Sequence, residues 1–249
     1  MAVVTLADER LALDAEPTLD TTLPHAPTVD PRPVPAESRA ALVEQRPAPV
    51  DDAAGSAGRI DLARARSAVA DLLGALGRDT RSEHLADTPR RVADALAEML
   101  TPRPFEMTTF PNDEGYDELV LVRDVPFHSL CEHHLLPFHG VAHLAYLPGE
   151  RIVGLSKLAR VLEHFSRDLQ VQERLTQQVA DLLQERLRPR GVGVVLEAEH
   201  LCMSLRGVAV TGSRTVTSAL RGTLREDPRS RAEFLALVGA GPAPRSYAG

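Results

Sequence analysis

The 249-residue sequence lacks several features that define large classes of protein. It has no run of roughly 18 apolar residues, the length that crosses a bilayer, so we expect no membrane span. Its first twenty residues carry acidic side chains instead of the basic start and continuous apolar run of a signal peptide, which predicts a cytoplasmic protein. A net charge of −7 disfavours nucleic acid as a partner, because non-specific binding needs a broad basic face.

Cysteine and lysine are both scarce. The two cysteines, Cys131 and Cys202, are enough for one disulfide, but a reducing compartment and the histidines around Cys131 favour a metal site. Lys157 is the only lysine among 28 basic residues. The apolar content of 43% is still enough for a packed core, so we expect one large domain or two small ones.

The composition changes near residue 58. Residues 1–57 contain eight of the nineteen prolines and no aromatic residue. Such a segment cannot bury enough apolar surface to offset the entropy lost on ordering, so the sequence predicts a disordered tail. We expect a folded domain over residues 58–241, followed by a short tail at 242–249.

The folded domain reads as α+β. Two amphipathic segments from Ile60 to Gly77 and from Asp87 or Thr88, with Pro89 in the first turn, predict an N-terminal helical hairpin. Mixed runs of strands and helices follow, which favours an antiparallel sheet packed with helices. The predicted strands are 117–127, 140–155, 191–205 and 215–222, and the predicted helices are 156–165, 171–187 and 227–238.

Histidine and cysteine are concentrated in the stretch HSLCEHHLLPFHG, residues 128–140. Cys131 and His134 are separated by two residues within it, a spacing that lets both reach one tetrahedral ion from a tight turn. In EHLC, His200 and Cys202 are expected to share one face of a strand. Thiolates and imidazole together select zinc over magnesium or calcium.

Two kinds of zinc site are compatible with this spacing. A catalytic zinc has three protein ligands and a position for water, whereas a structural zinc is closed by a fourth ligand, here His133, His200 or His128. The histidines left over favour the open site, because imidazoles transfer protons well at neutral pH. His139 and His143 are expected to be ordinary strand residues.

A second candidate site is GLSKLAR, residues 154–160. If a helix begins near Ser156, its free backbone N–H groups can bind an anion, with Ser156, Lys157 and Arg160 around its first turn. The single lysine in this place favours a phosphate site, although a solvated helix surface remains the alternative.

Five stretches, in order along the chain, together resemble the GTP cyclohydrolase I family: CEHH, GLSK, QVQERLTQQ, EHLCMSLRG and TVTSALRG. The similarity runs from about residue 60 to about residue 239. The resemblance implies a tunnelling fold (T-fold), in which sheets from several subunits form an oligomeric barrel ringed by helices. It implies a homodecamer with active sites between subunits, and a zinc-dependent hydrolase that converts GTP into 7,8-dihydroneopterin triphosphate and formate, the first step of pterin or tetrahydrofolate-type biosynthesis.

The resemblance also implies a role for individual residues. The implied zinc ligands are Cys131, His134 and Cys202, which agrees with the spacing argument. The implied proton-transfer groups are His133 and His200, in either order of steps, and Ser156 would help to position the substrate during ring closure. The implied guanine contacts are Glu173 and, beside it, Gln172. The implied triphosphate contacts are Ser156, Lys157, Arg160 and Arg206, with Arg91 reaching in from a neighbouring subunit.

The chain departs from the family pattern at two positions. Asp94 stands where some relatives have a basic residue, and Val141 stands where many have lysine, so phosphate affinity is expected to differ from that of relatives. Two other functions remain open: a non-catalytic pterin- or nucleotide-binding oligomer with a structural zinc, and an enzyme of the same fold acting on another purine or pterin. The product could feed folate, a deazapurine or another pterin.

Overall fold

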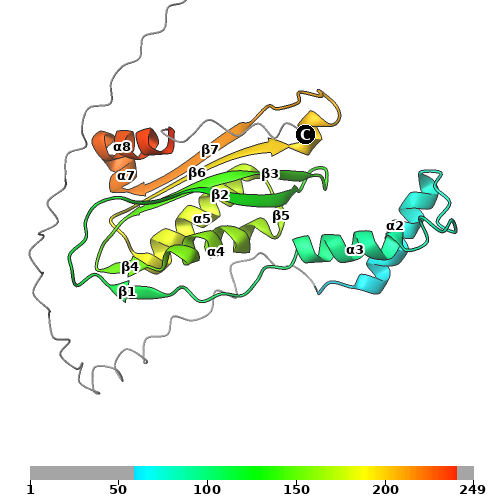
Figure 1. The fold of residues 1–249 in the computed structure, drawn as a ribbon, viewed down its shortest axis with the longest axis horizontal. Coiled ribbons are helices and arrows are strands. Elements are labelled where there is room, and N and C mark those ends of the chain that lie inside the picture. Colours follow the sequence, from blue (N-terminus) through cyan, green and yellow to red (C-terminus); the bar gives the residue numbers. More distant parts are fainter. Residues whose placement is uncertain (1–58, 240–249) are drawn as a thin grey trace, which may run out of the picture. The chain divides into compact units, whose positions relative to one another are not determined.

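A five-stranded sheet forms the centre of the molecule, which a computed structural model describes over residues 59–239 (Figure 1). The tails predicted at 1–57 and 242–249 lie outside these residues. Strand order is β5-β2-β3-β6-β7, and every neighbouring pair is antiparallel except β2 with β5. The strands are β2 (Val120–Cys131), β3 (Pro137–Leu147), β5 (Leu169–Gln170), β6 (Gly191–His200) and β7 (Thr215–Gly222). The α+β prediction is therefore confirmed.

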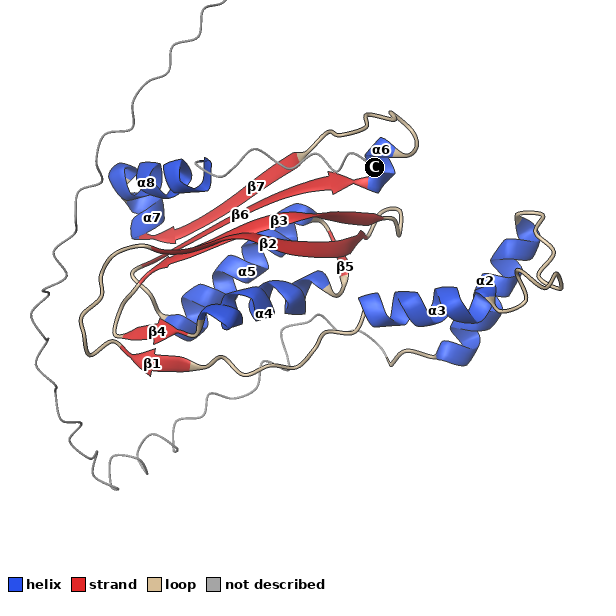
Figure 2. Cartoon of the chain, in the orientation of Figure 1, coloured by secondary structure: helices blue, strands red, loops and turns tan. Residues whose placement is uncertain are grey.

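Two helices cover one face of this sheet, α4 (Leu155–Ser166) and α5 (Gln172–Leu187) (Figure 2). Side chains alternate between the two faces of a strand, so every second residue of β3 points towards these helices. Phe138, Ala142 and Leu144 are fully buried there, in one apolar cluster with residues of α4 and α5. This layer fixes where the start of α5 lies relative to the strand ends.

The opposite face is partly covered by α7 (Thr223–Glu226) and α8 (Pro228–Gly239). Phe234 of α8 is fully buried, and its ring occupies the space above Gly193 of β6. A Cβ atom at position 193 would lie 2.9 Å from that ring, so glycine is needed for α8 to dock. A similar close approach occurs at Gly140 of β3, where a Cβ would lie 1.9 Å from the Glu197 carbonyl oxygen.

The N-terminal helices α2 (Leu62–Ala75) and α3 (Thr88–Met99) form the predicted hairpin. Arg66 of α2 donates to Asp94 of α3 at 2.9 Å, and Arg90 pairs with the same carboxylate at 3.1 Å. These two arginines hold the pKa of Asp94 below its ordinary value. The residue that departs from the family pattern therefore joins the two helices of the hairpin.

None of the described helices is long and apolar enough to span a bilayer.

Several segments differ from the prediction, beginning with the strand predicted at 117–127, which is β2 and runs from Val120 to Cys131. Residues 140–155 are not one strand: β3 ends at Leu147, and after a Pro-Gly turn β4 (Arg151–Val153) pairs with β1 (Thr109–Pro111), a short strand that the sequence did not indicate. The strand predicted to reach residue 205 ends at His200, and α6 (Leu201–Ser204) follows. The end of β6 is set by its partner strand. Phe138, next to the first residue of β3, pairs with His200, and no residue pair of β3 and β6 follows.

Candidate metal centre and active site

The turn between β2 and β3 brings the first two metal-ligand candidates together. Cys131 ends β2, and its carbonyl oxygen accepts from the N–H groups of His134 at 3.3 Å and Leu135 at 2.9 Å. Leu135 has a φ of +54°, a left-handed conformation that reverses the chain within a few residues. The turn therefore holds the Cys131 thiol 3.8 Å from Nδ1 of His134.

Cys202 completes a group of three donors. Ligand atoms of Cys131, His134 and Cys202 lie within 4.8 Å of one another, and both cysteines are free thiols. Cys131 is buried, Cys202 is half-buried and His134 is exposed. The prediction that His200 and Cys202 share a strand face is wrong, because Cys202 lies in the helical turn α6 that follows the strand. That turn still delivers its thiol to the other two donors.

The charge balance of this group suits a cation. Burial is the main cause that raises the pKa of the Cys202 thiol, and the neighbouring Cys131 raises it further. Arg206 lowers the same pKa. Two adjacent thiolates repel each other in a partly buried place, and a bound cation removes that repulsion. Two sulfur donors and one imidazole nitrogen fit a soft divalent metal and are a poor match for magnesium or calcium.

Two further histidines lie close to the three donors. Nδ1 of His133 is 4.0 Å from the Cys131 thiol. His200 stacks on the Phe138 ring at 4.6 Å between centroids, and its Nε2 lies 2.8 Å from Oε1 of Gln172. Within residues 59–239 neither histidine belongs to the three-donor group, and His128 does not belong to it either. His133 therefore lies beside the donor group, and His200 ends the strand that leads into α6, two residues before Cys202.

The two remaining histidines of the 128–143 region lie within β3, as expected. His139 is exposed, whereas His143 is buried, and burial lowers the pKa of His143 below its ordinary value. Asp124 donates its backbone N–H to Nδ1 of His143 at 3.4 Å. Neither side chain reaches the three donors in the described part of the chain.

An ion pair that the sequence did not reveal ties the CEHH turn to the start of α5. Arg174 donates to the Glu132 carboxylate at 2.5 Å, to the Leu169 carbonyl at 2.7 Å and to Oε1 of Gln170 at 3.1 Å. Arg174 also lowers the pKa of Glu132. The two residues are 42 positions apart, so no local pattern could have predicted their contact.

The start of α5 supplies the guanine-binding candidates. Gln172 is almost fully buried and Glu173 is exposed in the first helical turn. Burial lowers the pKa of His200, and the charge of Glu173 opposes that effect, so Glu173 lies close enough to influence His200. Glu173, His200 and the three donors are thus brought to one region by the ends of β2 and β6 and by the start of α5.

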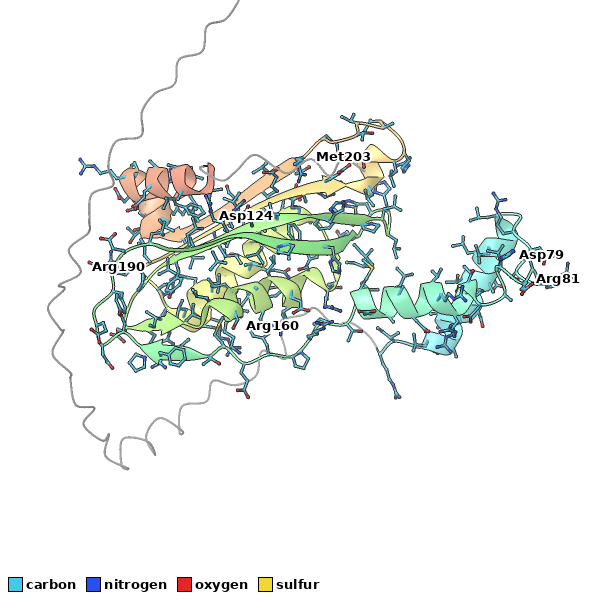
Figure 3. The ribbon with its side chains drawn as sticks, viewed as in Figure 1. Asp79, Arg81, Asp124, Arg160, Arg190 and Met203 are labelled. Carbon is cyan, nitrogen blue, oxygen red and sulfur yellow. The ribbon has the colours of Figure 1, made fainter. Side chains whose placement is uncertain are left out.

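The phosphate-binding candidates are not all brought to that region. Ser156 and Lys157 occupy the first turn of α4, which follows β4, and Arg160 pairs with Glu163 at 2.8 Å. Figure 3 places Arg160 on α4, below the sheet, and Met203, the neighbour of Cys202, above it at the end of β6. No hydrogen bond or ion pair in the described part of the chain joins these α4 residues to the donor group.

Two other arginines complete the set. Arg206 follows α6 and is close enough to the Cys202 thiol to affect its pKa. Arg91 of α3 pairs with Asp87 at 3.1 Å and remains 65% exposed. Among the five phosphate candidates, Arg206 is the one for which the described residues show an interaction with a metal donor.

These features define a class: an α+β protein whose strand ends present a metal-binding group of two thiols and one imidazole, flanked by further histidines. The sequence model of the family described as GTP cyclohydrolase I matches residues 65–239. GTP cyclohydrolase 1 of Aquifex aeolicus is 52% identical over 179 residues, covering 72% of this chain and 97% of the relative. The Mycolicibacterium vanbaalenii protein of the same name is 54% identical over 185 residues, covering 72% and 92%. The chain belongs to the GTP cyclohydrolase I family.

Proposed function

We propose that the protein is a GTP cyclohydrolase I, which hydrolyses GTP to 7,8-dihydroneopterin triphosphate and formate. The observation that carries this proposal is the convergence of Cys131, His134 and Cys202 in a chain more than 50% identical to relatives that bear that name. Because a fold alone does not fix a function, the site chemistry and the family membership are both needed.

We assign the metal as zinc, held by Cys131, His134 and Cys202. When bound, zinc with three protein ligands supplies a Lewis acid that activates water at neutral pH. The Cys131 thiol is buried and the His134 ring is exposed, so the three residues would hold the ion at the edge of the protein, accessible to a substrate.

His133 and His200 are the proposed proton-transfer groups. Each stands beside the donor group, His133 through its 4.0 Å approach to Cys131 and His200 at the end of β6. Opening the guanine ring and releasing formate each require a proton at a ring or leaving nitrogen, which a protonated imidazole can supply, and a neutral imidazole can accept a proton from water. Ser156, in the first turn of α4, would hold the substrate chain during the later ring closure.

The substrate would be held at both ends. Glu173, exposed beside His200, is suited to accept hydrogen bonds from the N–H groups of the guanine edge, and Gln172 precedes it in the chain. Ser156, Lys157, Arg160 and Arg206 are the proposed triphosphate contacts, and Arg91 is proposed to assist from a neighbouring subunit. Fixing both ends makes the ring closure effectively unimolecular.

We further propose that the site is completed by another copy of the chain. No hydrogen bond or ion pair in the described subunit joins Ser156, Lys157 or Arg160 to the metal donors. β7 is an edge strand, and the outer side of β2 is paired with β5 only at Leu130 and Cys131, so both edges of the sheet leave backbone groups unpaired. Edge strands of this kind pair readily with another chain. The assembly we propose is a homodecameric barrel in the cytoplasm, binding neither nucleic acid nor membrane.

Incubation of the purified protein with GTP tests this function directly. We expect formate, together with pterin absorbance and fluorescence after dephosphorylation and oxidation. Zinc binding and GTP binding without any formate would instead identify a non-catalytic binding oligomer. Turnover of another purine or pterin in place of GTP would identify a different enzyme of the same fold.

A further inference from the structure

The side chain of Gln172 is held from several directions at the start of α5, where it is 1% exposed. Its Nε2 carries two hydrogens and has three acceptors within reach, the Leu196 carbonyl at 3.1 Å, the Thr215 carbonyl at 3.0 Å and the Thr217 hydroxyl at 3.1 Å, so one hydrogen is shared between two of them. Carbonyl oxygens only accept hydrogen bonds, so the amide nitrogen must face these groups of β6 and β7. The amide oxygen is thereby aimed at His200, with 2.8 Å between Oε1 and Nε2.

This orientation fixes which nitrogen of His200 carries the hydrogen. Because Oε1 of Gln172 is an acceptor only, Nε2 of His200 must be the donor, and Nδ1 of a neutral ring is then the nitrogen with a free lone pair. The Phe138 ring lies parallel to the imidazole within 3°, which restrains the plane of the ring. The tautomer and the orientation of His200 are both set by its surroundings.

The hydroxyls of two threonines, Thr176 and Thr217, complete the network, and their donor and acceptor roles follow from their neighbours. The Thr176 hydroxyl donates to the backbone carbonyl of Gln172 at 2.6 Å and therefore accepts from the Thr217 hydroxyl at 2.7 Å. The Thr217 oxygen is then free to accept from the Gln172 amide. Each hydroxyl thus has a single direction compatible with its neighbours, and the amide of Gln172 cannot turn over without losing several bonds.

We propose that Gln172 is a positioning residue, which holds His200 in the Nε2–H tautomer so that Nδ1 faces the reaction. This inference rests on the proposed function, because it gives His200 the proton-transfer role. A side chain occupied in this way acts through His200, whereas the neighbouring Glu173 has an exposed carboxylate for the guanine. The alternative is a direct contact between the Gln172 side chain and the guanine.

Steady-state kinetics of Gln172→Leu separate the two roles. We expect kcat to fall by about 10- to 100-fold, the range for partners that orient an active-site histidine, with the KM for GTP and the bound zinc unchanged. Gln184→Leu is the matched control, because Gln184 is a half-buried glutamine near the far end of the same helix. Its kcat and KM should equal those of the wild type.

A second pair of variants keeps the test decisive if Gln172→Leu does not fold. Thr217→Val preserves shape but removes the hydroxyl that accepts from Gln172, so we expect a smaller loss of kcat in the same direction. Thr217→Ser keeps the hydroxyl and should restore kcat to near the wild-type value. Failure of serine to restore turnover would show that packing, and not the hydrogen bond, matters at this position.

Two results would overturn the positioning role in an active protein. A raised KM with unchanged kcat in Gln172→Leu would indicate a direct guanine contact, and unchanged values of both would remove any role. Failure of the proposed function looks different, because the wild type itself would then release no formate from GTP. That outcome would also overturn the role assigned here to His200 and Gln172.

Discussion

Single charged groups are expected to decide how strongly the proposed site binds an anionic substrate. Lys157 is half-buried in the first turn of α4, and no carboxylate among the described residues pairs with it. Arg160, one turn later, already pairs with Glu163. An ammonium without a carboxylate partner, beside the N–H groups of a helix start, is expected to attract phosphate more strongly than a guanidinium that already donates to a carboxylate.

Lys157→Ala tests this difference. We expect the KM for GTP to rise by about 10- to 100-fold, the loss of one or two charge-assisted hydrogen bonds, with much less effect on competitive inhibition by guanosine. Lys157→Arg keeps the charge and should lie between alanine and the wild type. Equal effects on GTP and guanosine would rule out a phosphate contact.

His200→Ala tests the proton-transfer role at the same scale. Turnover should fall by about 10²- to 10⁴-fold while the bound zinc remains, because His200 is not one of the three donors. His139→Ala, an exposed histidine of β3, is the matched control and should keep full activity. Normal turnover of the His200 variant would exclude this residue from the chemistry.

Sequence spacing predicted the site residues unevenly. Cys131 and His134 belong to one tight turn, so their meeting follows from local geometry. Cys202 was assigned to a strand and lies in α6, because the end of β3 decides where β6 can continue to pair. The partners of His200 were invisible to spacing, since Phe138 and Gln172 come from separate elements that meet only after folding.

At the scale of elements, periodic segments were predicted well and elements made by pairing were not. The helices that begin at Thr88, Leu155 and Gln172 have amphipathic patterns. Such a pattern can be recognised in the local sequence before any tertiary partner is known. The strands β1 and β4 are three residues each and exist because they pair with each other. A segment this short carries no periodic signal of its own.

The start of α8 has a pH-dependent cap. The Ser230 hydroxyl and the Ser230 backbone N–H both donate to the Asp227 carboxylate. These bonds lower the pKa of Asp227, and the hydroxyl has the larger effect. Because the pKa of Asp227 is lower in the folded than in the unfolded chain, its ionised carboxylate stabilises the folded protein. This contribution is complete above the unfolded pKa of about 3.9 and disappears as the pH falls through the folded pKa.

Thermal unfolding midpoints of the wild type and Asp227→Asn test this cap. The wild type should be the more stable by a constant margin above about pH 5, and the margin should shrink as the pH falls towards about 3. Other carboxylates titrate in both proteins, so the difference isolates Asp227. A margin that does not change with pH would show that the charge of the carboxylate is not what stabilises α8.

At the scale of the whole molecule, the proposed site and the proposed assembly depend on each other. The metal donors lie at one end of the sheet, whereas Ser156 and Lys157 begin a helix that follows β4. The family resemblance predicts a site shared between subunits, and no hydrogen bond or ion pair of the described subunit joins the two groups of residues. A subunit with two open sheet edges is expected to gain both stability and its phosphate contacts on assembly.

Native mass and activity measured together test this dependence. Ten copies of the 27.0 kDa chain give a particle of about 270 kDa. Specific activity should fall on dilution in step with the loss of that particle. A monomer that retains full specific activity would contradict a site shared between subunits.

The most direct test of the central claim is to measure bound zinc and formate release from GTP in the same preparations of wild type and Cys202→Ser. Removing one of two thiolates weakens the site, so both quantities should fall together, and the wild type should release one formate for each GTP consumed. A Cys202→Ser protein with normal zinc and normal formate release would contradict the account.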